Sequence, residues 1–209
     1  KQFTVTNDYV QLQVEFPLKV ISSAVHNAGM GWYNNFLNRS ISPYYNIENV
    51  KEEAVQFLLE RGFSLTNTVV MLTAVTANLV AIRSFHHERF SITIAVTAGV
   101  GNAVDVTRTY ERQDTPYIGT INTWVIVNGK LSDEAFYQAM ITATEAKTKA
   151  LAEEDIRDMK TNTIATGTAT DSLLIAATQH GEEMPYAGPI TDVGKLIGHG
   201  VFETTVEAI

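Results

Sequence analysis

The sequence predicts an α+β or mixed α/β fold: a single domain over residues 1–209 with a largely antiparallel or mixed sheet packed by helices. Three observations indicate this fold class. The 209 residues suit one large domain, strand-like segments come in runs, and helical segments are interspersed among the runs without a strict strand–helix alternation. No linker or low-complexity tract divides the chain, so two smaller domains are disfavoured.

The N-terminal part of the chain predicts strands followed by a loop. Residues 3–25 are expected to form two or three short strands, since apolar residues alternate with polar ones. The apolar positions are Val10, Leu12, Val14 and Phe16. Residues 26–47 have no clean period and are rich in Asn, Gly and aromatic residues, so we expect an ordered loop there.

Three helices and five further strands are expected after this loop. The strands are expected at residues 68–75, 78–85, 90–99 and 119–129 and within the stretch 165–176, and the helices at residues 49–62, 132–155 and 192–209. Asn49 can cap the first helix and Gly62 suits its C-terminal end. Gly194 and Gly198 lie four apart in the last helix, which predicts a face that a second backbone can approach closely.

Composition and charge narrow the function classes. The net charge of −8 without a basic stripe argues against a nucleic-acid partner. The absence of cysteine excludes disulfides, thiolate catalysis and cysteine-bound metal, and fits a reducing cytoplasm. The start KQFTVTNDYV has no signal-like apolar segment, and no apolar run approaches the ~18 residues of a membrane span. We therefore expect a cytoplasmic protein without a membrane partner; a homo-oligomer is compatible with the sequence.

The segment ATGTATDSLLIA, residues 165–176, is the first candidate site. In an extended chain alternate side chains point to opposite sides. The two sets are Thr166, Thr168 and Thr170 on one side, and Gly167, Ala169 and Asp171 on the other. These hydroxyls and the carboxylate could form the edge of a reaction pocket. The structural alternative is a threonine-rich entry into a buried strand.

The helix at residues 132–155 contains a second unusual position. On a helical wheel Lys147 falls on the apolar stripe that is expected to be buried, whereas Glu145 falls on the outer side with Lys149. Because an unpaired buried charge costs several kcal/mol, the Lys147 ammonium must reach solvent or find a partner. Glu145 and Lys149 are expected to form an ordinary surface pair.

Three asparagines are further candidates. Asn122 begins an apolar run, so its amide is expected to be buried and either to fasten a neighbouring loop or to face a ligand. Asn27 and Asn102 stand in glycine-flanked turns. The glycine patterns are not nucleotide fingerprints, and the five histidines show no metal-ligand spacing, so no metal is expected.

Six segments together resemble a known family. They are SSAVHNAG, VTAGVGNA, GTINTWVIVN, TEAKTKAL, ATGTATDS and YAGPITDVGKLIG. In this order and spacing the chain resembles the adenosylcobinamide amidohydrolases from about residue 20 to about residue 208. The family commonly has two glycines after its first asparagine, where this chain has Ala28 and Gly29.

The resemblance implies a reaction of corrinoid salvage in cobalamin biosynthesis. Such enzymes hydrolyse the amide that joins the aminopropanol arm to the corrin propionate of adenosylcobinamide. The products are adenosylcobyric acid and 1-amino-2-propanol. The corrinoid would be the substrate, and no cofactor is expected.

Amide hydrolysis requires a nucleophile, oxyanion donors and a proton for the amine, and the matching motifs offer groups for each. We expect Asp171 to orient and deprotonate water or a threonine hydroxyl, with Thr166 or Thr168 the favoured threonines. Asn122 and the Gly167 N–H would hold the oxyanion. Lys147 would protonate the amine, and Glu145 would either tune Lys147 or take its place as the proton donor. The expected substrate-binding residues are Asn27, Trp32, Asn102, Gly167 and Thr170.

Other functions remain open at this stage. A corrinoid-binding protein without hydrolysis would keep the same motifs as binding contacts. An amidase for a different small substrate is a second alternative. A third is a threonine-nucleophile hydrolase activated by self-cleavage before Thr166 or Thr168.

Overall fold

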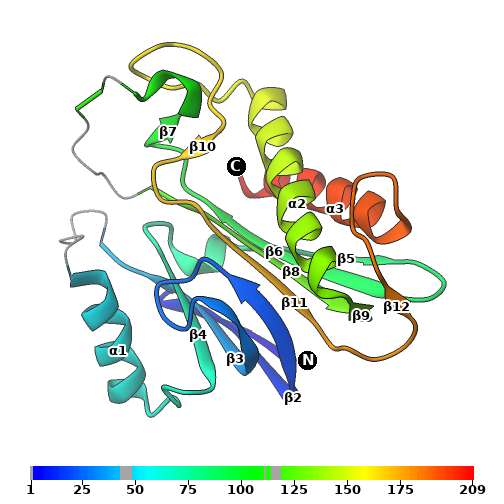
Figure 1. The fold of residues 1–209 in the computed structure, drawn as a ribbon. Helices are drawn as coiled ribbons and strands as arrows, with labels where there is room; N and C mark the ends of the chain where they lie inside the picture. Colours follow the sequence, from blue (N-terminus) through cyan, green and yellow to red (C-terminus); the bar gives the residue numbers. More distant parts are fainter. Residues whose placement is uncertain (1, 43–48, 111, 114–118) are drawn as a thin grey trace.

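The computed structural model describes residues 2–42, 49–110, 112–113 and 119–209, which form a mixed α/β domain built on one large sheet (Figure 1). The strands of this sheet are β1 (Gln2–Val5), β2 (Tyr9–Ser22), β3 (Gly29–Ser40), β4 (Thr68–Thr73), β5 (Ala81–His86), β6 (Ser91–Ala98), β8 (Ile121–Asn128) and β11 (Ser172–Ala177). Their order is β4-β3-β2-β11-β8-β6-β5, with β1 added to β2. β3 and β4 pair in parallel, as do β8 and β11, and the other pairs are antiparallel, so the predicted fold class is confirmed.

Three helices and two small sheets complete the described part of the chain. They are α1 (Val50–Arg61), α2 (Asp133–Glu153), α3 (Asp192–Ala208), the sheet of β7 (Ala103–Val104) with β10 (Gly167–Thr168), and the sheet of β9 (Lys130–Leu131) with β12 (Glu183–Met184). Short 3-10 turns lie at Ala77–Leu79 and Val106–Arg108. Within the described residues, no helix combines the length and apolar character that crossing a membrane requires.

The sheet curls so strongly that its distant strands touch. The Trp124 indole N–H of β8 donates to the Met71 sulfur of β4 at 3.2 Å, although β3, β2 and β11 lie between these two strands in the sheet. The Phe36 ring of β3 also packs edge-on against Trp124, with centroids 6.5 Å apart. One apolar core therefore fills the concave face of the open sheet.

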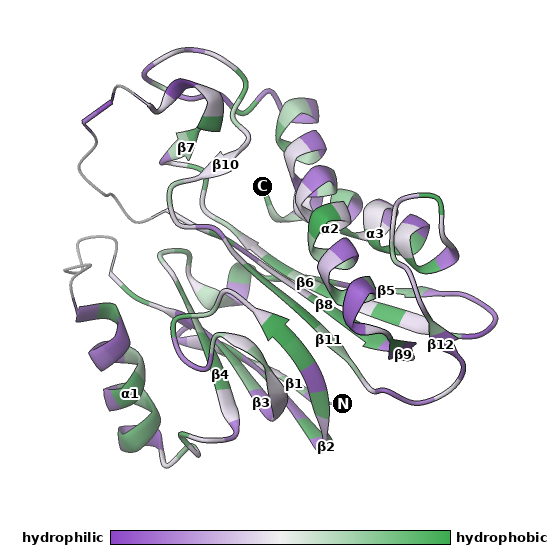
Figure 2. Cartoon of the chain, in the orientation of Figure 1, coloured by the Kyte–Doolittle hydropathy of each residue, from purple (hydrophilic) through white to green (hydrophobic). Residues whose placement is uncertain are grey.

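The helices pack on the opposite, convex face. α2 and α3 lie side by side over β6, β8 and β11, and α1 covers β3 and β4 at the far end (Figure 1). Figure 2 shows apolar residues concentrated along the strands, while each helix alternates between apolar and polar residues. Because α1 and α2 lie over different ends of the sheet, part of the convex face at β2 and β3 carries exposed side chains, such as Met30 and Trp32.

The predictions of helices at residues 49–62 and 132–155 are confirmed by α1 and α2. α2 begins after Ser132, whose hydroxyl accepts a hydrogen bond from the Ala135 N–H at 3.1 Å. α1 ends at Gly62, which adopts a left-handed φ of 70°. Asn49 occupies the N-cap position of α1, but its side chain makes no capping hydrogen bond. A polar residue at the right position therefore marks the helix start without capping it.

The prediction of a loop at residues 26–47 is wrong for most of its length, because Gly29–Ser40 forms strand β3; residues 43–47 lie outside the described residues. Two buried positions of β3, one on each face of the sheet, carry amides in place of apolar side chains. Asn35 donates to the Thr68 hydroxyl at 3.1 Å, and Asn38 donates to the Thr97 hydroxyl at 2.8 Å. These satisfied buried amides remove the period-2 pattern by which a strand is recognised.

The N-terminal strands also differ in detail from the prediction. Residues 9–22 form one long strand, and its first three alternating apolar residues are buried as expected. Phe16 is 66% exposed, because the register of β2 with β3 shifts between Gln13 and Leu18. The irregularity breaks the alternation and turns Phe16 outward.

The close approach predicted for α3 occurs at one of the two glycines. A Cβ on Gly194 would lie 1.9 Å from the Gly188 carbonyl oxygen, so only glycine fits there. Around Gly198 a Cβ would meet the Thr142 side chain only at 3.7 Å, an ordinary contact. Of these two glycines only Gly194 is required by close packing; Gly200 of the same helix is a further close contact, since a Cβ there would lie 2.6 Å from the Ile94 side chain.

Asp158 anchors the segment that follows α2. Its side chain is 1% exposed and accepts hydrogen bonds from the Asp105 N–H at 3.0 Å and the Lys160 N–H at 2.9 Å. The Arg112 guanidinium donates to the same carboxylate at 2.5 Å. Burial alone would raise the pKa of Asp158, but these donors together lower it below its ordinary value of 3.8.

We expect acid to loosen this segment through Asp158. A carboxylate whose pKa is lower in the folded state stabilises the fold above its unfolded pKa and loses that contribution as the pH falls through the folded pKa. The melting temperature should therefore fall steeply below about pH 4. Asp158→Asn should lower the melting temperature at pH 7 and flatten its acid dependence. Asp155→Asn, at a carboxylate with 70% exposure, is the control; an unchanged acid slope in Asp158→Asn would contradict this role.

Candidate active site

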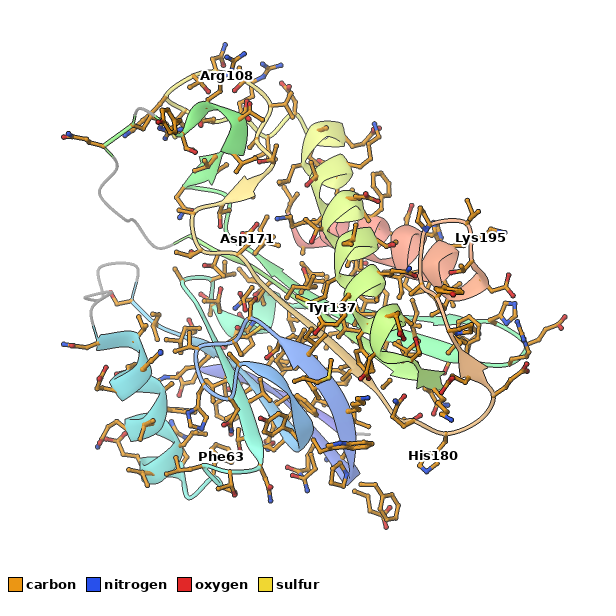
Figure 3. All side chains as sticks on the ribbon, in the orientation of Figure 1. Phe63, Arg108, Tyr137, Asp171, His180 and Lys195 are labelled. Atoms are coloured by element: carbon orange, nitrogen blue, oxygen red, sulfur yellow. The ribbon has the colours of Figure 1, made fainter. Side chains whose placement is uncertain are left out.

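Lys147 and Asp171 form a partly buried ion pair between α2 and the start of β11. Their side chains are only 13% and 20% exposed, respectively. Lys147 lies on the inward stripe of α2, as the helical wheel predicts, and its ammonium finds a carboxylate there in place of solvent. Figure 3 labels Asp171 at the end of β11 that lies next to α2.

The Asp171 carboxylate is held by four donors. Oδ1 accepts from the Ile121 N–H at 3.0 Å and from the Thr168 hydroxyl at 2.5 Å. Oδ2 accepts from the Thr168 N–H at 3.1 Å and from the Lys147 ammonium. Because a carboxylate offers about four lone-pair positions, these donors occupy its accepting capacity and fix its orientation.

A turn at residues 169–170 brings Asp171 back to Thr168. The expectation that their side chains point to opposite sides of an extended strand is therefore wrong for this pair. The Thr170 hydroxyl donates to the Gly119 carbonyl at 2.8 Å, and the Thr168 hydroxyl, whose proton points to Asp171, lies 3.1 Å from the same carbonyl. These contacts fasten the motif to the residues that lead into β8.

Thr166 lies apart from this cluster. Its hydroxyl accepts from the Val106 N–H at 3.0 Å and donates to the Val104 carbonyl at 3.3 Å. The hydroxyl thus holds β10 against the segment after β7. The structure does not bring it to Asp171, so of the two threonines that the sequence favours, only Thr168 contacts the carboxylate.

Gly167 lies directly against the ion pair. A Cβ on this residue would lie 2.5 Å from Asp171 Oδ2 and 2.8 Å from Lys147 Nζ. No side chain larger than hydrogen can therefore occupy the position while the pair keeps its geometry. The steric need for glycine at this point of the motif is clear only from the tertiary structure.

The ion pair forms part of the wall of a cavity of about 250 Å³. The lining residues are Ser23, Ile121, Thr123, Met140, Ala143, Thr144, Lys147, Asp171, Ser172 and Leu173. They come from α2, β8, β11 and the end of β2. The cavity is therefore a largely apolar space with one charged pair and a few hydroxyls in its wall.

Asn122 faces the opposite side of the sheet. Its amide N–H₂ donates to the Asn38 side-chain oxygen at 2.7 Å and to the Leu72 carbonyl at 2.8 Å, within the concave core. The prediction that Asn122 is buried is confirmed, but its side chain does not reach the cavity. The GTIN segment instead contributes the backbone N–H of Ile121, which binds Asp171.

Glu145 is exposed on the outer side of α2, away from the cavity lining. The surface pair expected between Glu145 and Lys149 is not formed, because Lys149 pairs with Glu153 at 3.7 Å. A lysine on a helix can reach a carboxylate four residues on either side, so sequence spacing alone does not choose between them.

The three expected binding residues outside the TGTATD motif lie in different surroundings. Asn27 has a left-handed φ of 56°, and its amide donates to the Leu65 and Thr68 carbonyls at 2.9 and 2.8 Å, so it fastens a turn. The Asn102 side chain packs against Gly119: a Cβ on Gly119 would collide with the Asn102 side-chain oxygen. Trp32 is 55% exposed on β3.

Four hydroxyl residues of the cavity, Ser23, Thr123, Thr144 and Ser172, are not among the candidates from the sequence. The Ser23 and Ser172 hydroxyls lie 3.1 Å apart, and the Leu173 N–H donates to Ser23 at 3.0 Å. Thr123 lies on β8 and is 2% exposed. The position of Ser172 directly after Asp171 could have indicated it as a site residue. Thr123 lies in an apolar run that is typical of a strand, where threonine is common, so its sequence position does not indicate a site.

In the described part of the chain, no three His, Asp or Glu side chains gather as a possible metal site. The charged centre of the cavity is the lysine–aspartate pair itself. Fold and site together define a mixed α/β protein with a lysine–aspartate ion pair in the wall of a largely apolar cavity.

The chain belongs to the CbiZ family, adenosylcobinamide amidohydrolase, whose family model matches residues 1–209. The family name places the chain among hydrolases of amide bonds. It is 31% identical over 175 residues to the adenosylcobinamide amidohydrolase of Methanosarcina mazei, a match that covers 82% of this chain and 78% of that protein. It is 30% identical over 192 residues to the uncharacterized protein MJ1613 of Methanocaldococcus jannaschii, covering 82% and 75%.

A solved structure supports the fold. The PH0078 protein from Pyrococcus horikoshii OT3 superimposes with a TM-score of 0.54 at 9% identity, covering 99% of this chain and 78% of that chain. At this identity the likeness concerns the arrangement of the helices and strands alone.

Proposed function

We propose that the protein hydrolyses the aminopropanol amide of adenosylcobinamide and releases adenosylcobyric acid and 1-amino-2-propanol, as an enzyme of corrinoid salvage. The observation that carries the proposal is the Lys147–Asp171 pair in the cavity wall of a chain that the family model covers from end to end. A lysine beside a cavity for an amide arm supplies the mobile proton that this reaction requires.

In the proposed mechanism Lys147 carries the proton and Asp171 positions it. The four donors on Asp171 leave it little capacity to take a proton from water, which favours a positioning role over that of a general base. The ammonium stabilises the negative charge that develops on the amide oxygen as water attacks the carbonyl carbon.

The proton balance then closes within the cavity. As the C–N bond breaks, Lys147 gives a proton to the amide nitrogen, and it recovers one from the attacking water. The water oxygen remains in the carboxyl group of the corrinoid product. The Thr168 hydroxyl, bound to Asp171 at 2.5 Å, keeps the carboxylate turned toward Lys147.

The corrin ring is proposed to rest on the exposed face beside the cavity. Met30 and Trp32 are 40% and 55% exposed on β3, and Tyr137 and Ile141 are 56% and 58% exposed on α2. In Figure 3 Tyr137 lies on α2 beside β11. Apolar and aromatic side chains suit the flat, largely apolar faces of a macrocycle, which supports Trp32 as a substrate-binding residue.

Three other residues that the sequence suggests for substrate binding are proposed to act as structural supports. Thr170, Asn102 and Asn27 serve as structural supports of the loops around the cavity, since their polar groups are engaged with, or packed against, neighbouring backbone. Their influence on substrate binding would then be indirect.

The test is incubation of the purified protein with adenosylcobinamide, followed by mass spectrometry of both products. We expect 1-amino-2-propanol and adenosylcobyric acid in equal amounts, with one oxygen from the solvent incorporated into the acid in H₂¹⁸O. Binding of adenosylcobinamide without release of the amine would identify a non-catalytic corrinoid-binding protein. Absence of binding would point to an amidase of another substrate.

A further inference from the structure

Thr123 carries a buried hydroxyl in the wall of this cavity. The residue is 2% exposed, and its Oγ1 makes no hydrogen bond within the described part of the protein. The other hydroxyls of the cavity are engaged: Ser23 and Ser172 bind each other, and Thr144 donates to the Met140 carbonyl at 2.8 Å. A buried hydroxyl without a partner is costly, so its position in a cavity wall makes it a candidate ligand-binding group.

The size of the cavity limits which part of the substrate can reach Thr123. Its volume of about 250 Å³ is below the roughly 300–1,000 Å³ of pockets that enclose drug-sized ligands, so the corrin ring must stay outside. A slender arm fits the space that the Lys147–Asp171 pair helps to line. If the scissile amide lies at that pair, the leaving amine occupies the rest of the cavity.

The chemistry of the interior matches a small amino alcohol. Ile121, Ala143 and Leu173 provide apolar walls, and Thr123 provides the one deeply buried hydroxyl among the lining residues. The 1-amino-2-propanol group has one methyl group and one hydroxyl. An apolar wall suits the former, and a hydroxyl with no other partner suits the latter.

We propose that this cavity is the leaving-group site and that the Thr123 hydroxyl binds the hydroxyl of the aminopropanol arm. This inference rests on the proposed function and adds the residue that distinguishes a hydroxylated amine from a plain alkyl amine. Thr123 lies on β8 two residues after Ile121, whose N–H holds Asp171, so one rigid strand sets both the leaving group and the ion pair.

The experiment replaces Thr123 by Val, which keeps the shape and removes the hydroxyl, with Thr123→Ser as the control that keeps it. For Thr123→Val we expect kcat/KM for adenosylcobinamide to fall on the order of tenfold, the effect of one buried hydrogen bond. Inhibition by 1-amino-2-propanol should weaken by a similar factor, while inhibition by propylamine should stay unchanged. The melting temperature should not fall, because Thr123 Oγ1 makes no hydrogen bond with any of the described residues.

Three outcomes separate the hypotheses. Unchanged turnover and unchanged inhibition by 1-amino-2-propanol in Thr123→Val would overturn the leaving-group site while leaving the proposed function intact. Equal weakening of both amines together with a lower melting temperature would show a packing role and would also overturn it. A wild-type protein that releases no amine from adenosylcobinamide would refute the proposed function itself, whatever the variant does.

Discussion

Lys147→Met is expected to lower kcat for adenosylcobinamide by about 100- to 10,000-fold, the range for loss of a proton-transferring group. Methionine has a similar length and can fill the inward stripe of α2, so the protein should remain folded. Asp171 keeps the other three donors, from Ile121 and Thr168, which limits the cost of leaving its charge without the ammonium. Steady-state release of 1-amino-2-propanol measures the effect.

Lys149→Met is the matched control, because Lys149 lies two residues further along the same helix. Its side chain is 68% exposed and forms only a surface pair with Glu153. Surface pairs of this kind contribute about 0–1 kcal/mol, so turnover and melting temperature should both stay near the wild type. A Lys147→Met enzyme that keeps more than about a tenth of wild-type turnover would rule out Lys147 as the proton carrier.

Gly167→Ala is expected to produce the second large loss. The added methyl would lie within 3 Å of both Asp171 Oδ2 and Lys147 Nζ, so the ion pair must separate or the β10 backbone must shift. A displacement of about 1 Å in a reacting group costs on the order of 100-fold in rate, so we expect a fall of that size in kcat. Binding of the corrinoid should change little, because the proposed ring surface lies on β3 and α2.

The control for this substitution is Gly101→Ala, since a Cβ on Gly101 would meet no atom within 4 Å. Both variants add the same methyl group to a glycine outside the large sheet, but only one places it against the ion pair. Wild-type kcat in Gly167→Ala would show that the Lys147–Asp171 geometry is not required for turnover. A tighter or weaker corrinoid affinity with normal kcat would place Gly167 in binding instead.

Sequence reasoning, with the family resemblance, assigned Lys147 and Asp171 to one active site, but it did not predict that their side chains form an ion pair. The helical period placed Lys147 on a buried stripe, and the TGTATD motif selected Asp171, yet nothing local paired two residues 24 positions apart. The pairing depends on the turn at residues 169–170, which brings the Asp171 side chain back toward Thr168. The sequence had placed these two side chains on opposite sides.

Asn122 shows a second limit of sequence reasoning. Its burial follows from the apolar run around it, but two faces of a fully buried strand look alike in sequence. The curl of the sheet decides the matter, because it brings Asn38 and Leu72 onto the concave side, where they accept hydrogen bonds from the Asn122 amide. The same curl explains the buried Asn38 of β3, whose amide bonds to Thr97 of β6 and Asn122 of β8 across the folded sheet, whereas Asn35 bonds to Thr68 of the neighbouring strand β4.

The sequence by itself determined the fold class, the long helix α2 with Lys147 on its inner side, and the set of motifs that belong to the CbiZ family. Only the tertiary structure decided which polar groups meet, Lys147 with Asp171 and Asn122 with Asn38, and that Thr123 lines the cavity. The physical reason is the difference in sequence range between the two kinds of interaction. Helical and strand periods act over a few residues, whereas the partner of a buried polar group is set by whichever distant segment packs against it.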